Sequence, residues 1–394
     1  MAIESFGTEA SSRRLRLGMV GGGRGAFIGA VHRMAARLDD KYELVAGALS
    51  STEENARLSA ADLHVAEDRA YSDFREMARA EAAREDGIDV VSIVAPNHVH
   101  FDAAKAFLDA GIHVICDKPM TLTLAESKEL VRVARASEAK FVLTQNNTGY
   151  PMVRQARAMV ADGTLGAIRV VRTSYVQDWL ATALDEEGQK QAAWRTDPAL
   201  AGAGGSIGDI GVHAFNLAAF VTGLRLKSVC ADLASYVPGR RLDDNANVLL
   251  RYENGATGTL WATQVAPGNY NRLSIGVYGE QGGLEWVGEE NDDLHYTPLG
   301  EPTRLITRGG PGALDVANRV TRMPPRHPEG YIEGFANVYS DAAALIWAAK
   351  DGEAAEGVDL LPDVEDGLHG LAFIDACVRS SREGGVWTDL DDAV

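Results

Sequence analysis

The chain has 394 residues, of which 46% are hydrophobic and 24% are charged, and its formal net charge is −18. These proportions are typical of a globular protein with two domains, and they exclude disordered and fibrous chains. A surface this acidic repels nucleic-acid phosphates and anionic lipids, which argues against nucleic-acid and membrane partners.

Residues 1–14 are polar and aperiodic, and we predict that they form a flexible tail. After them, short apolar runs alternate with longer amphipathic segments up to about residue 146. This alternation is typical of an α/β domain with a parallel sheet covered on both faces. The predicted strands are Leu15–Val20, Tyr42–Leu49, Val90–Val94, His113–Cys116 and Phe141–Thr144, and the predicted helices are Ala26–Leu38, Thr52–Leu63, Phe74–Glu85, His100–Ala110 and Leu122–Ala136.

The pattern changes in the remaining residues, 147–394, where most strands are long and show a period of two. This predicts an α+β domain with a large, mostly antiparallel open sheet, one face of which is exposed or paired with another subunit. The predicted strands are Ile168–Val176, Leu226–Leu233, Ala246–Tyr252, Ala256–Gln264, Arg272–Gly279 and Gly282–Trp286, and the predicted helices are Met152–Asp162, Gly211–Thr222, Tyr331–Ala349 and Leu361–Ser381.

A glycine-rich turn lies between the first strand and the first helix. It fits the pattern G-x-G-x-x-A, which permits a tight turn, close approach of a pyrophosphate and close packing of the helix. The helix N-terminus then offers free N–H groups to phosphates. The turn predicts a Rossmann dinucleotide-binding domain over residues 15–146, with cofactor contacts at Gly21, Gly23, Arg24, Gly25 and Ala26.

The second strand ends in Ser50 and Ser51, where an Asp or Glu would bind the adenosine ribose of NAD. No arginine follows at once to hold the 2′-phosphate of NADP. We predict ribose contacts from these two serines, although Ser51 is equally well explained as a helix cap. NAD is the predicted cofactor, and NADP is not excluded.

Polar residues follow two further strands of the predicted parallel sheet. Pro96, Asn97 and His100 come after Val90–Val94, and Asp117 and Lys118 come after His113–Cys116. Ligands bind at the carboxyl edge of such sheets, so all five are predicted to contact the cofactor. Lys118 is also predicted to act in catalysis, because its ammonium group can stabilise developing oxyanion charge.

A third cluster contains Asp209 and His213, which lie four residues apart and would share one face of a helix. Histidine titrates near neutral pH and can accept a hydroxyl proton while hydride leaves, and a carboxylate one turn away can orient it. Nothing nearby completes a metal site, so we expect none. Aromatic and polar side chains suited to a sugar ring complete the predicted substrate contacts, which are Lys118, Tyr150, Tyr175, Trp179, Arg195, Asp209 and His213.

Three motifs in this order resemble the glucose-fructose oxidoreductase, inositol dehydrogenase and rhizopine catabolism (Gfo/Idh/MocA) family. They are the glycine turn, the sequence Asp117-Lys118-Pro119 where the family has Glu-Lys-Pro, and a Gly-Gly-x-x-x-Asp-x-Gly-x-His segment that ends at His213. The resemblance implies NAD(P)-dependent oxidation or reduction of a sugar or cyclitol hydroxyl, with Lys118, Asp209 and His213 at the catalytic positions. The chain departs from the family at Asp117 and at Asn216, where many members have Asp.

We therefore predict a dehydrogenase for a sugar, sugar derivative or cyclitol. The alternative is an NAD-dependent glycosidase, in which transient oxidation at C3, elimination and re-reduction use tightly bound NAD. A cofactor sensor without catalysis is disfavoured, because a sensor needs no proton-transfer group such as His213.

Assembly and compartment are predicted from the second half of the chain and from the cysteines. The runs Val248-Leu249-Leu250 and Leu260-Trp261-Ala262 carry apolar residues in both registers, so we predict a homodimer or homotetramer joined through the sheet face. The competing explanation is that residues 292–325 fold over that face. Cys116, Cys230 and Cys377 are far apart, which indicates reduced thiols and a cytoplasmic protein.

Overall fold

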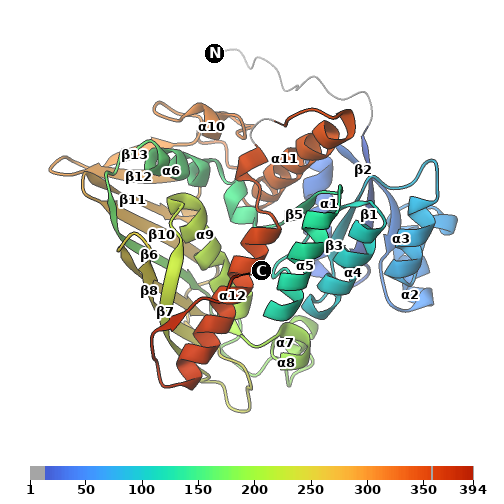
Figure 1. Cartoon of the computed structure of the whole chain (residues 1–394), viewed down its shortest axis with the longest axis horizontal. Coiled ribbons are helices and arrows are strands. Elements are labelled where there is room, and N and C mark those ends of the chain that lie inside the picture. Colours follow the sequence, from blue (N-terminus) through green and yellow to red (C-terminus); the bar gives the residue numbers. More distant parts are fainter. Residues whose placement is uncertain (1–13, 356–357, 394) are drawn as a thin grey trace. The chain divides into compact units, whose positions relative to one another are not determined.

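The computed structural model describes residues 14–355 and 358–393, which form two compact units (Figure 1). Unit 1 contains the chain up to Met120, Glu129–Gly149 and Tyr331–Val364, and unit 2 contains Thr121–Lys128, Tyr150–Gly330 and the chain from Glu365. The predicted tail lies outside the described residues except for Arg14. The sequence predicted a single domain boundary near residue 146, whereas the chain returns to unit 1 at Tyr331.

Unit 1 is built on a five-stranded parallel sheet with the order β2-β1-β3-β4-β5, as the strand and helix alternation predicted. Burial explains the parallel arrangement, because β3 is buried along its whole length and so needs cover on both faces. The strands are β1 (Leu15–Gly21), β2 (Tyr42–Ala48), β3 (Val90–Val94), β4 (His113–Cys116) and β5 (Phe141–Leu143). The helices are α1 (Phe27–Leu38), α2 (Glu53–Asp62), α3 (Phe74–Ala82), α4 (Asn97–Asp109) and α5 (Leu124–Ala136).

Helix α11 (Tyr331–Asp351) explains why a late segment belongs to unit 1. It contributes Phe335, Tyr339 and Ile346 to the same buried core as Leu15 and Leu17 of β1. These side chains are at most 2% exposed. A helix this far along the chain therefore completes the hydrophobic core of the dinucleotide-binding unit.

Unit 2 is built on a nine-stranded sheet with the order β13-β12-β11-β10-β6-β9-β8-β7-β14. Its neighbouring strands are antiparallel except β6 and β9, as expected for a mostly antiparallel sheet. The strands are β6 (Ile168–Val176), β7 (Leu226–Ala234), β8 (Asn245–Tyr252), β9 (Thr257–Thr263), β10 (Arg272–Gly279), β11 (Gly282–Val287), β12 (Asp293–Pro298), β13 (Arg304–Thr307) and β14 (Thr388–Asp389).

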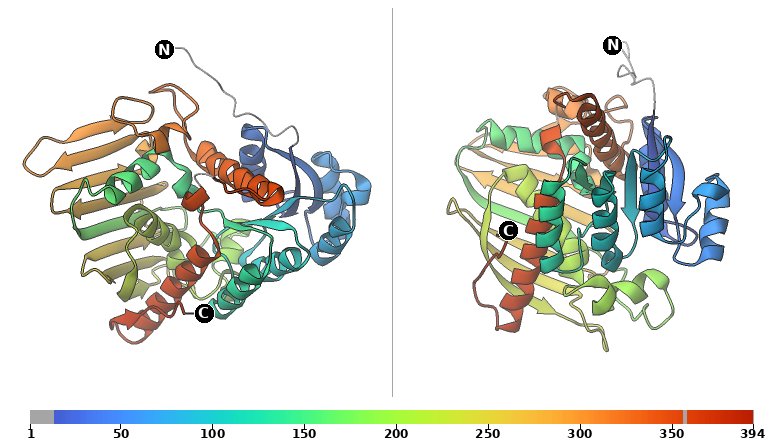
Figure 2. Two further views of the ribbon diagram at one scale, coloured as in Figure 1. Left: turned by 45° about the horizontal axis from the view of Figure 1, so that its top comes forward. Right: turned by 45° about the vertical axis from the view of Figure 1, so that its right-hand side comes forward.

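Helices cover one face of this sheet, as Figure 2 shows for α6 (Pro151–Ala161), α9 (Val212–Thr222) and α12 (Val364–Arg382). On the other face, β-strand alternation exposes large apolar side chains. Leu249 is 49% exposed and Trp261 is 42% exposed, although their chain neighbours are at most 2% exposed. We call this second face the open face.

The segment from Asp292 to Pro325 does not fold over the open face. Its first part forms β12 and β13, which extend the sheet at its edge. Its second part contains the short helix α10 (Asp315–Asn318) and is held to α6 by the Gln155 side chain, which bonds the carbonyl of Gly312 and the N–H of Leu314. Other short elements are α7 (Lys190–Arg195), α8 (Pro198–Ala201), the 3₁₀ turns 67–69, 146–149, 288–290 and 358–360, and a π-helical turn, η3 (Ile207–Gly211).

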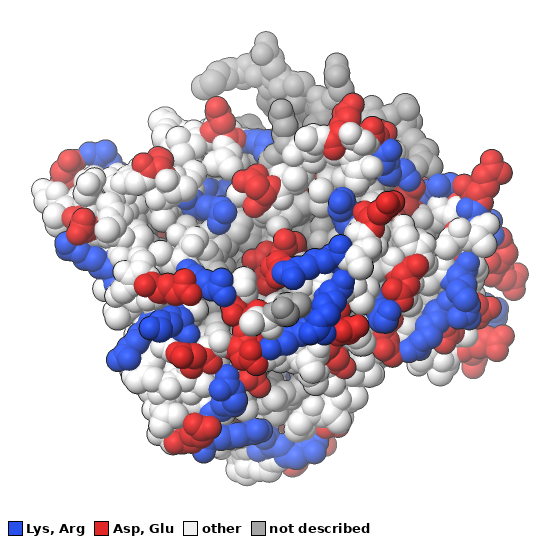
Figure 3. Space-filling model, in the orientation of Figure 1, with Lys and Arg blue, Asp and Glu red and all other residues white. Residues whose placement is uncertain are grey.

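On the face shown in Figure 3, acidic and basic side chains lie side by side. Within the described ranges, no helix combines the length and apolar character needed to cross a bilayer.

Candidate active site

The turn between β1 and α1 has the backbone shape that its glycines predict. Gly21, Gly22 and Gly25 have φ values of +77°, +72° and +77°, a region that other residues seldom adopt. A Cβ atom added at Gly29 would lie 2.3 Å from the Cα of Gly22, so α1 packs directly on the turn. Sequence analysis assigned close helix packing to Ala26; it missed Gly29, three residues further along the helix.

The N-terminus of α1 has the features of a phosphate site. Ala26 is its N-cap and supplies no side-chain oxygen to the first N–H groups. Free N–H groups and the positive end of the helix dipole favour a pyrophosphate at this position. The described residues of the turn therefore fit a dinucleotide.

Gly23 brings this turn against the end of β2. Its N–H donates to the carbonyl of Leu49 at 3.2 Å, and a Cβ atom at Gly23 would lie 2.5 Å from that oxygen. Gly23 is therefore required for packing inside the protein. Ser50, which follows Leu49 in the chain, accepts hydrogen bonds from the Thr52 N–H and the Asn55 amide. Ser51 is exposed.

The polar residues after β3 divide into two kinds. Pro96 is the N-cap of α4, and Asn97 is its first residue and is buried. The His100 ring is 1% exposed, and its two nitrogens lie 2.8 Å from the carbonyl oxygens of Ala95 and Pro119. Both nitrogens therefore face backbone, so His100 braces the two strand ends. The sequence predicted that His100 contacts the cofactor, and it did not predict the contacts of its ring with these two backbone carbonyls.

Asp117 and Lys118 follow β4 at the same edge of the sheet. The Asp117 N–H donates to the carbonyl of Ile93 in β3, and its carboxylate accepts hydrogen bonds from the Lys118 N–H at 2.9 Å and the Thr144 hydroxyl at 3.1 Å. The peptide bond between Lys118 and Pro119 is cis. The carboxylate of Asp117 thus anchors the backbone that carries Lys118.

A buried polar network reaches Asp117 from the interior. The Tyr339 hydroxyl lies 2.8 Å from both Ser92 Oγ and His32 Nδ1, and His32 Nε2 lies 3.9 Å from Asp117 Oδ1. Burial lowers the pKa of His32 to about 4, so the imidazole is neutral at neutral pH. Sequence analysis missed this network; its signal was a histidine on the otherwise apolar inner face of α1.

In unit 2, Asp209 lies in the π-helical turn η3, and His213 follows in α9. The sequence predicted a helix from Gly211 and a shared helical face for Asp209 and His213; it did not predict the π-helical turn that carries Asp209. The carboxylate of Asp243 holds the start of this segment, because it accepts hydrogen bonds from the N–H groups of Gly205 and Ile207. Short π-helical turns recur at functional sites in proteins.

Gln264 and Arg195 hold the Asp209 carboxylate. Its Oδ2 accepts a hydrogen bond from Gln264 Nε2 at 2.9 Å and lies 3.3 Å from Arg195 Nε. The Arg195 guanidinium also lies over the rings of Trp194 and Trp179, 4.2 and 5.9 Å from their centroids. The Arg195 guanidinium therefore holds the Asp209 carboxylate in place.

The His213 ring lies beside further polar and aromatic side chains. Its centroid is 5.9 Å from that of Tyr175, whose hydroxyl donates to the Asn271 side chain. Gln177 donates to the same Asn271 oxygen at 2.8 Å. Tyr150, another predicted substrate contact, is 7% exposed and packs on Trp286 in the core.

The structure therefore gathers the predicted residues into two sets. In unit 1, the glycine turn and the strand ends with Asn97 and Lys118 lie at the carboxyl edge of the parallel sheet. In unit 2, Asp209 and His213 lie among aromatic rings and amides. Sequence analysis missed Gln264, Asn271 and Asp243, which reach this second set from distant strands and loops.

Known proteins match the chain along most of its length. Residues 15–146 match the NAD-binding Rossmann fold of the Gfo/Idh/MocA oxidoreductase family, and residues 153–285 match a Gfo/Idh/MocA C-terminal domain. The uncharacterized oxidoreductase YfiI of Bacillus subtilis is 37% identical over 98% of this chain and 99% of its own length.

Solved structures show the same similarity. An oxidoreductase from Sinorhizobium meliloti is 55% identical, with a TM-score of 0.87 and coverage of 95% of this chain and 99% of that one. An inositol dehydrogenase homolog from Azotobacter vinelandii complexed with NAD⁺ is 36% identical, with a TM-score of 0.91 and coverage of 96% and 98%. A structure of that homolog with NADH and myo-inositol is 34% identical, with a TM-score of 0.89 and the same coverage.

Proposed function

The chain belongs to the Gfo/Idh/MocA family of NAD-binding oxidoreductases, and on that basis we propose that it oxidises a secondary hydroxyl of a sugar, sugar derivative or cyclitol. The observation that carries the proposal is the arrangement in unit 2. His213 lies beside Tyr175 there, and Asp209 is held by Arg195 and Gln264. A proton acceptor among aromatic rings and amides suits a polyhydroxylated ring.

The predicted roles of the chain's own residues follow from their chemistry. NAD, when bound, supplies the hydride acceptor. His213 accepts the proton of the substrate hydroxyl as the hydride leaves the same carbon, which completes a two-electron oxidation. The Lys118 ammonium donates a hydrogen bond to that oxygen as negative charge develops on it. Asp209 orients the substrate or the imidazole.

Charge supports a neutral substrate. The guanidinium of Arg195 is paired with Asp209, so this cation is compensated within unit 2. A carboxylate or phosphate on the substrate would need an uncompensated cation in its place. The myo-inositol bound to the Azotobacter homolog is itself uncharged, in line with this argument.

The test is a screen of sugars, anhydrosugars, cyclitols and sugar acids with NAD, followed by the absorbance of NADH. A dehydrogenase produces one NADH per ketone formed, and the neutral polyols are expected to give this signal. The alternative glycosidase would release sugar from a glycoside over many turnovers without net NADH. Glycoside cleavage without NADH would therefore replace the proposal with that alternative.

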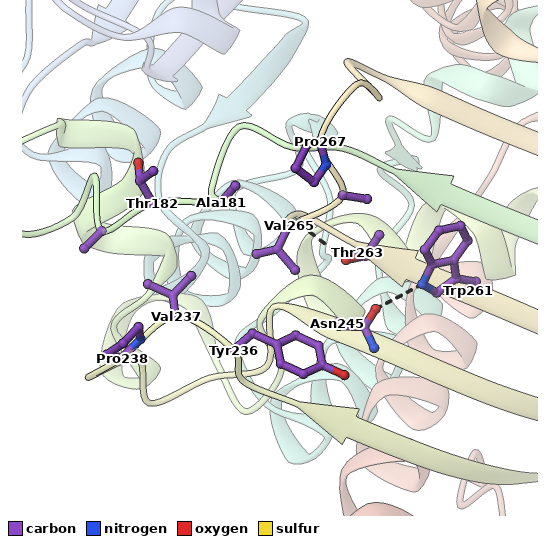
Figure 4. A pocket seen from close by; sticks show the side chains of 12 residues that line it. Ala181, Thr182, Tyr236, Val237, Pro238, Asn245, Trp261, Thr263, Val265 and Pro267 are labelled. Atoms are coloured by element: carbon purple, nitrogen blue, oxygen red, sulfur yellow. Dashed lines mark hydrogen bonds between the residues drawn. The ribbon is translucent and has the colours of Figure 1, made fainter.

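We propose also that the protein assembles as a homodimer or homotetramer through the open face of unit 2. Val170, Leu249 and Trp261 belong to this face by strand register and are 39%, 49% and 42% exposed. A pocket of about 500 Å³ lies at one end of the face, with Trp261 and Tyr236 in its lining (Figure 4). Large exposed apolar side chains on one sheet face are typical of an interface between copies.

A further inference from the structure

The end of β2 lacks the carboxylate that selects NAD over NADP in many Rossmann domains. Ser50 and Ser51 stand there, and neither can repel a 2′-phosphate. Arg24 belongs to the glycine turn and lies next to this strand end. Its N–H donates to Ser59 Oγ at 3.1 Å, while the preceding Gly23 N–H donates to Leu49. A nearby arginine and the absence of an acid together favour NADP.

Asp62 opposes that preference. Its carboxylate pairs in bidentate fashion with the Arg24 guanidinium, with Nε–Oδ2 and Nη2–Oδ1 distances of 2.5 and 2.8 Å. The side chains of Arg24 and Asp62 are 47% and 48% exposed, so a ligand can reach the pair. Asp62 is the last residue of α2, so the whole helix separates it in sequence from Ser50 and Ser51. The residues at the end of β2 therefore could not indicate the pair between Asp62 and Arg24.

We propose that Asp62 sets the cofactor preference of this protein through Arg24. While the pair is intact, the carboxylate compensates the guanidinium charge and occupies its Nε and Nη2 donors, so a 2′-phosphate gains little from it. When the carboxylate is removed, the same guanidinium becomes a phosphate ligand beside the ribose. The inference rests on the cofactor part of the proposed function and is independent of the substrate.

The test measures binding of two probes that differ only in the 2′-phosphate, adenosine 5′-monophosphate and adenosine 2′,5′-bisphosphate. Asp62→Ala is expected to raise the ratio of bisphosphate affinity to monophosphate affinity by about tenfold, which is a modest gain for one charge-assisted contact at a half-exposed site. Asp62→Glu keeps the pair and is expected to keep the parental ratio. Arg24→Ala together with Asp62→Ala should remove the gain.

Asp109→Ala is the matched control. It breaks the pair between Asp109 and Lys105 and changes the net charge by the same amount. Asp109 ends α4, which begins directly after β3, so it lies at the opposite edge of the sheet from the strand ends. Its probe ratio should equal that of the parent. Glu53 and Glu54 in the first turn of α2 are present in every variant and cannot cause a difference.

Each outcome is decisive. An unchanged ratio in Asp62→Ala, or an equal rise in Asp109→Ala, overturns the assignment of Asp62. A gain that persists in the double variant overturns the role of Arg24. A parent protein that binds neither probe nor NAD would instead overturn the cofactor part of the proposed function.

Discussion

Two residues carry the proton and the developing charge in the proposed reaction. Replacing His213 with Ala removes the proton acceptor, and replacing Lys118 with Ala removes the donor to the developing oxyanion. Each change is expected to lower kcat by about 10²- to 10⁴-fold, the usual contribution of a positioned acid or base. Steady-state kinetics on the substrate found in the screen measures this effect, and the affinity for NAD should change little in His213→Ala.

A control histidine separates this effect from a general loss of folding. His369, 40% exposed in its side chain, should be replaceable by Ala without loss of turnover. Parental turnover in Lys118→Ala would contradict the proposed mechanism. Retained activity in His213→Ala alone would transfer the base role to Lys118.

Arg195 is expected to act through Asp209. Arg195→Ala should lower kcat/KM by roughly tenfold, because Asp209 loses its ion pair with the guanidinium. Arg195→Lys should recover only part of the loss, since an ammonium keeps the charge but does not reproduce the planar fork over Trp194. Arg241→Ala breaks a neighbouring exposed pair with Asp197 and serves as the control. Equal kcat/KM in Arg195→Ala and Arg241→Ala would contradict the role of Arg195.

At the scale of elements, unit 1 joins its strand ends to distant helices through buried polar groups. The network of Ser92, Tyr339 and His32 connects β3, α11 and α1, and it ends beside Asp117. His100 joins the ends of β3 and β4 in the same way. These contacts hold the backbone of Lys118 from several directions, and they link its position to the packing of the whole unit.

This network predicts a loss of stability in acid. The pKa of His32 is lowered by burial to about 4 in the folded protein, below its ordinary value of 6.5. Between these values the unfolded chain binds more protons than the folded chain, so stability falls as the pH decreases from about 6.5 to 4. From pH 7 to pH 5, His32 alone should contribute a loss of about 2 kcal/mol.

Hydrogen exchange of β1 and β4 peptides in urea at the two pH values measures this loss. His32→Gln removes the titrating group, so its free energy of unfolding should differ less between pH 7 and pH 5 than that of the parent. Burial also lowers the pKa of the buried His100 and of the half-buried His113, and these two histidines remain in both proteins. The same pH dependence in parent and variant would show that His32 does not titrate as described.

At the scale of the whole molecule, the open face of unit 2 predicts assembly. Light scattering over a dilution series should give two or four times the 42.1 kDa chain mass. Trp261→Glu places a charge on the open face and should dissociate the assembly. Leu38→Glu, at an exposed position of α1 in unit 1, is the control and should leave the mass unchanged. A mass of one chain at every concentration would refute this interface.

The sequence by itself determined the elements that local patterns control. The five strands of unit 1 and the glycine turn were predicted because apolar runs, β-branched residues and glycine act over a few neighbouring residues. The alternation of Val248, Leu249 and Leu250 indicated a sheet with an apolar exposed face for the same reason. The three motifs around Gly23, Lys118 and His213 were enough to identify the family resemblance.

Only the tertiary structure decided which distant residues meet. His32 and Tyr339 are 307 positions apart, yet they share a hydrogen bond. Asp62 pairs with Arg24 from the far end of a helix, and Gln264 reaches Asp209 from the end of β9. The return of α11 to unit 1 depends in the same way on the burial of its apolar face against α1. Such contacts depend on strand order and helix packing, which arise when apolar surfaces far apart in the chain are buried together, and no local period or motif encodes that choice.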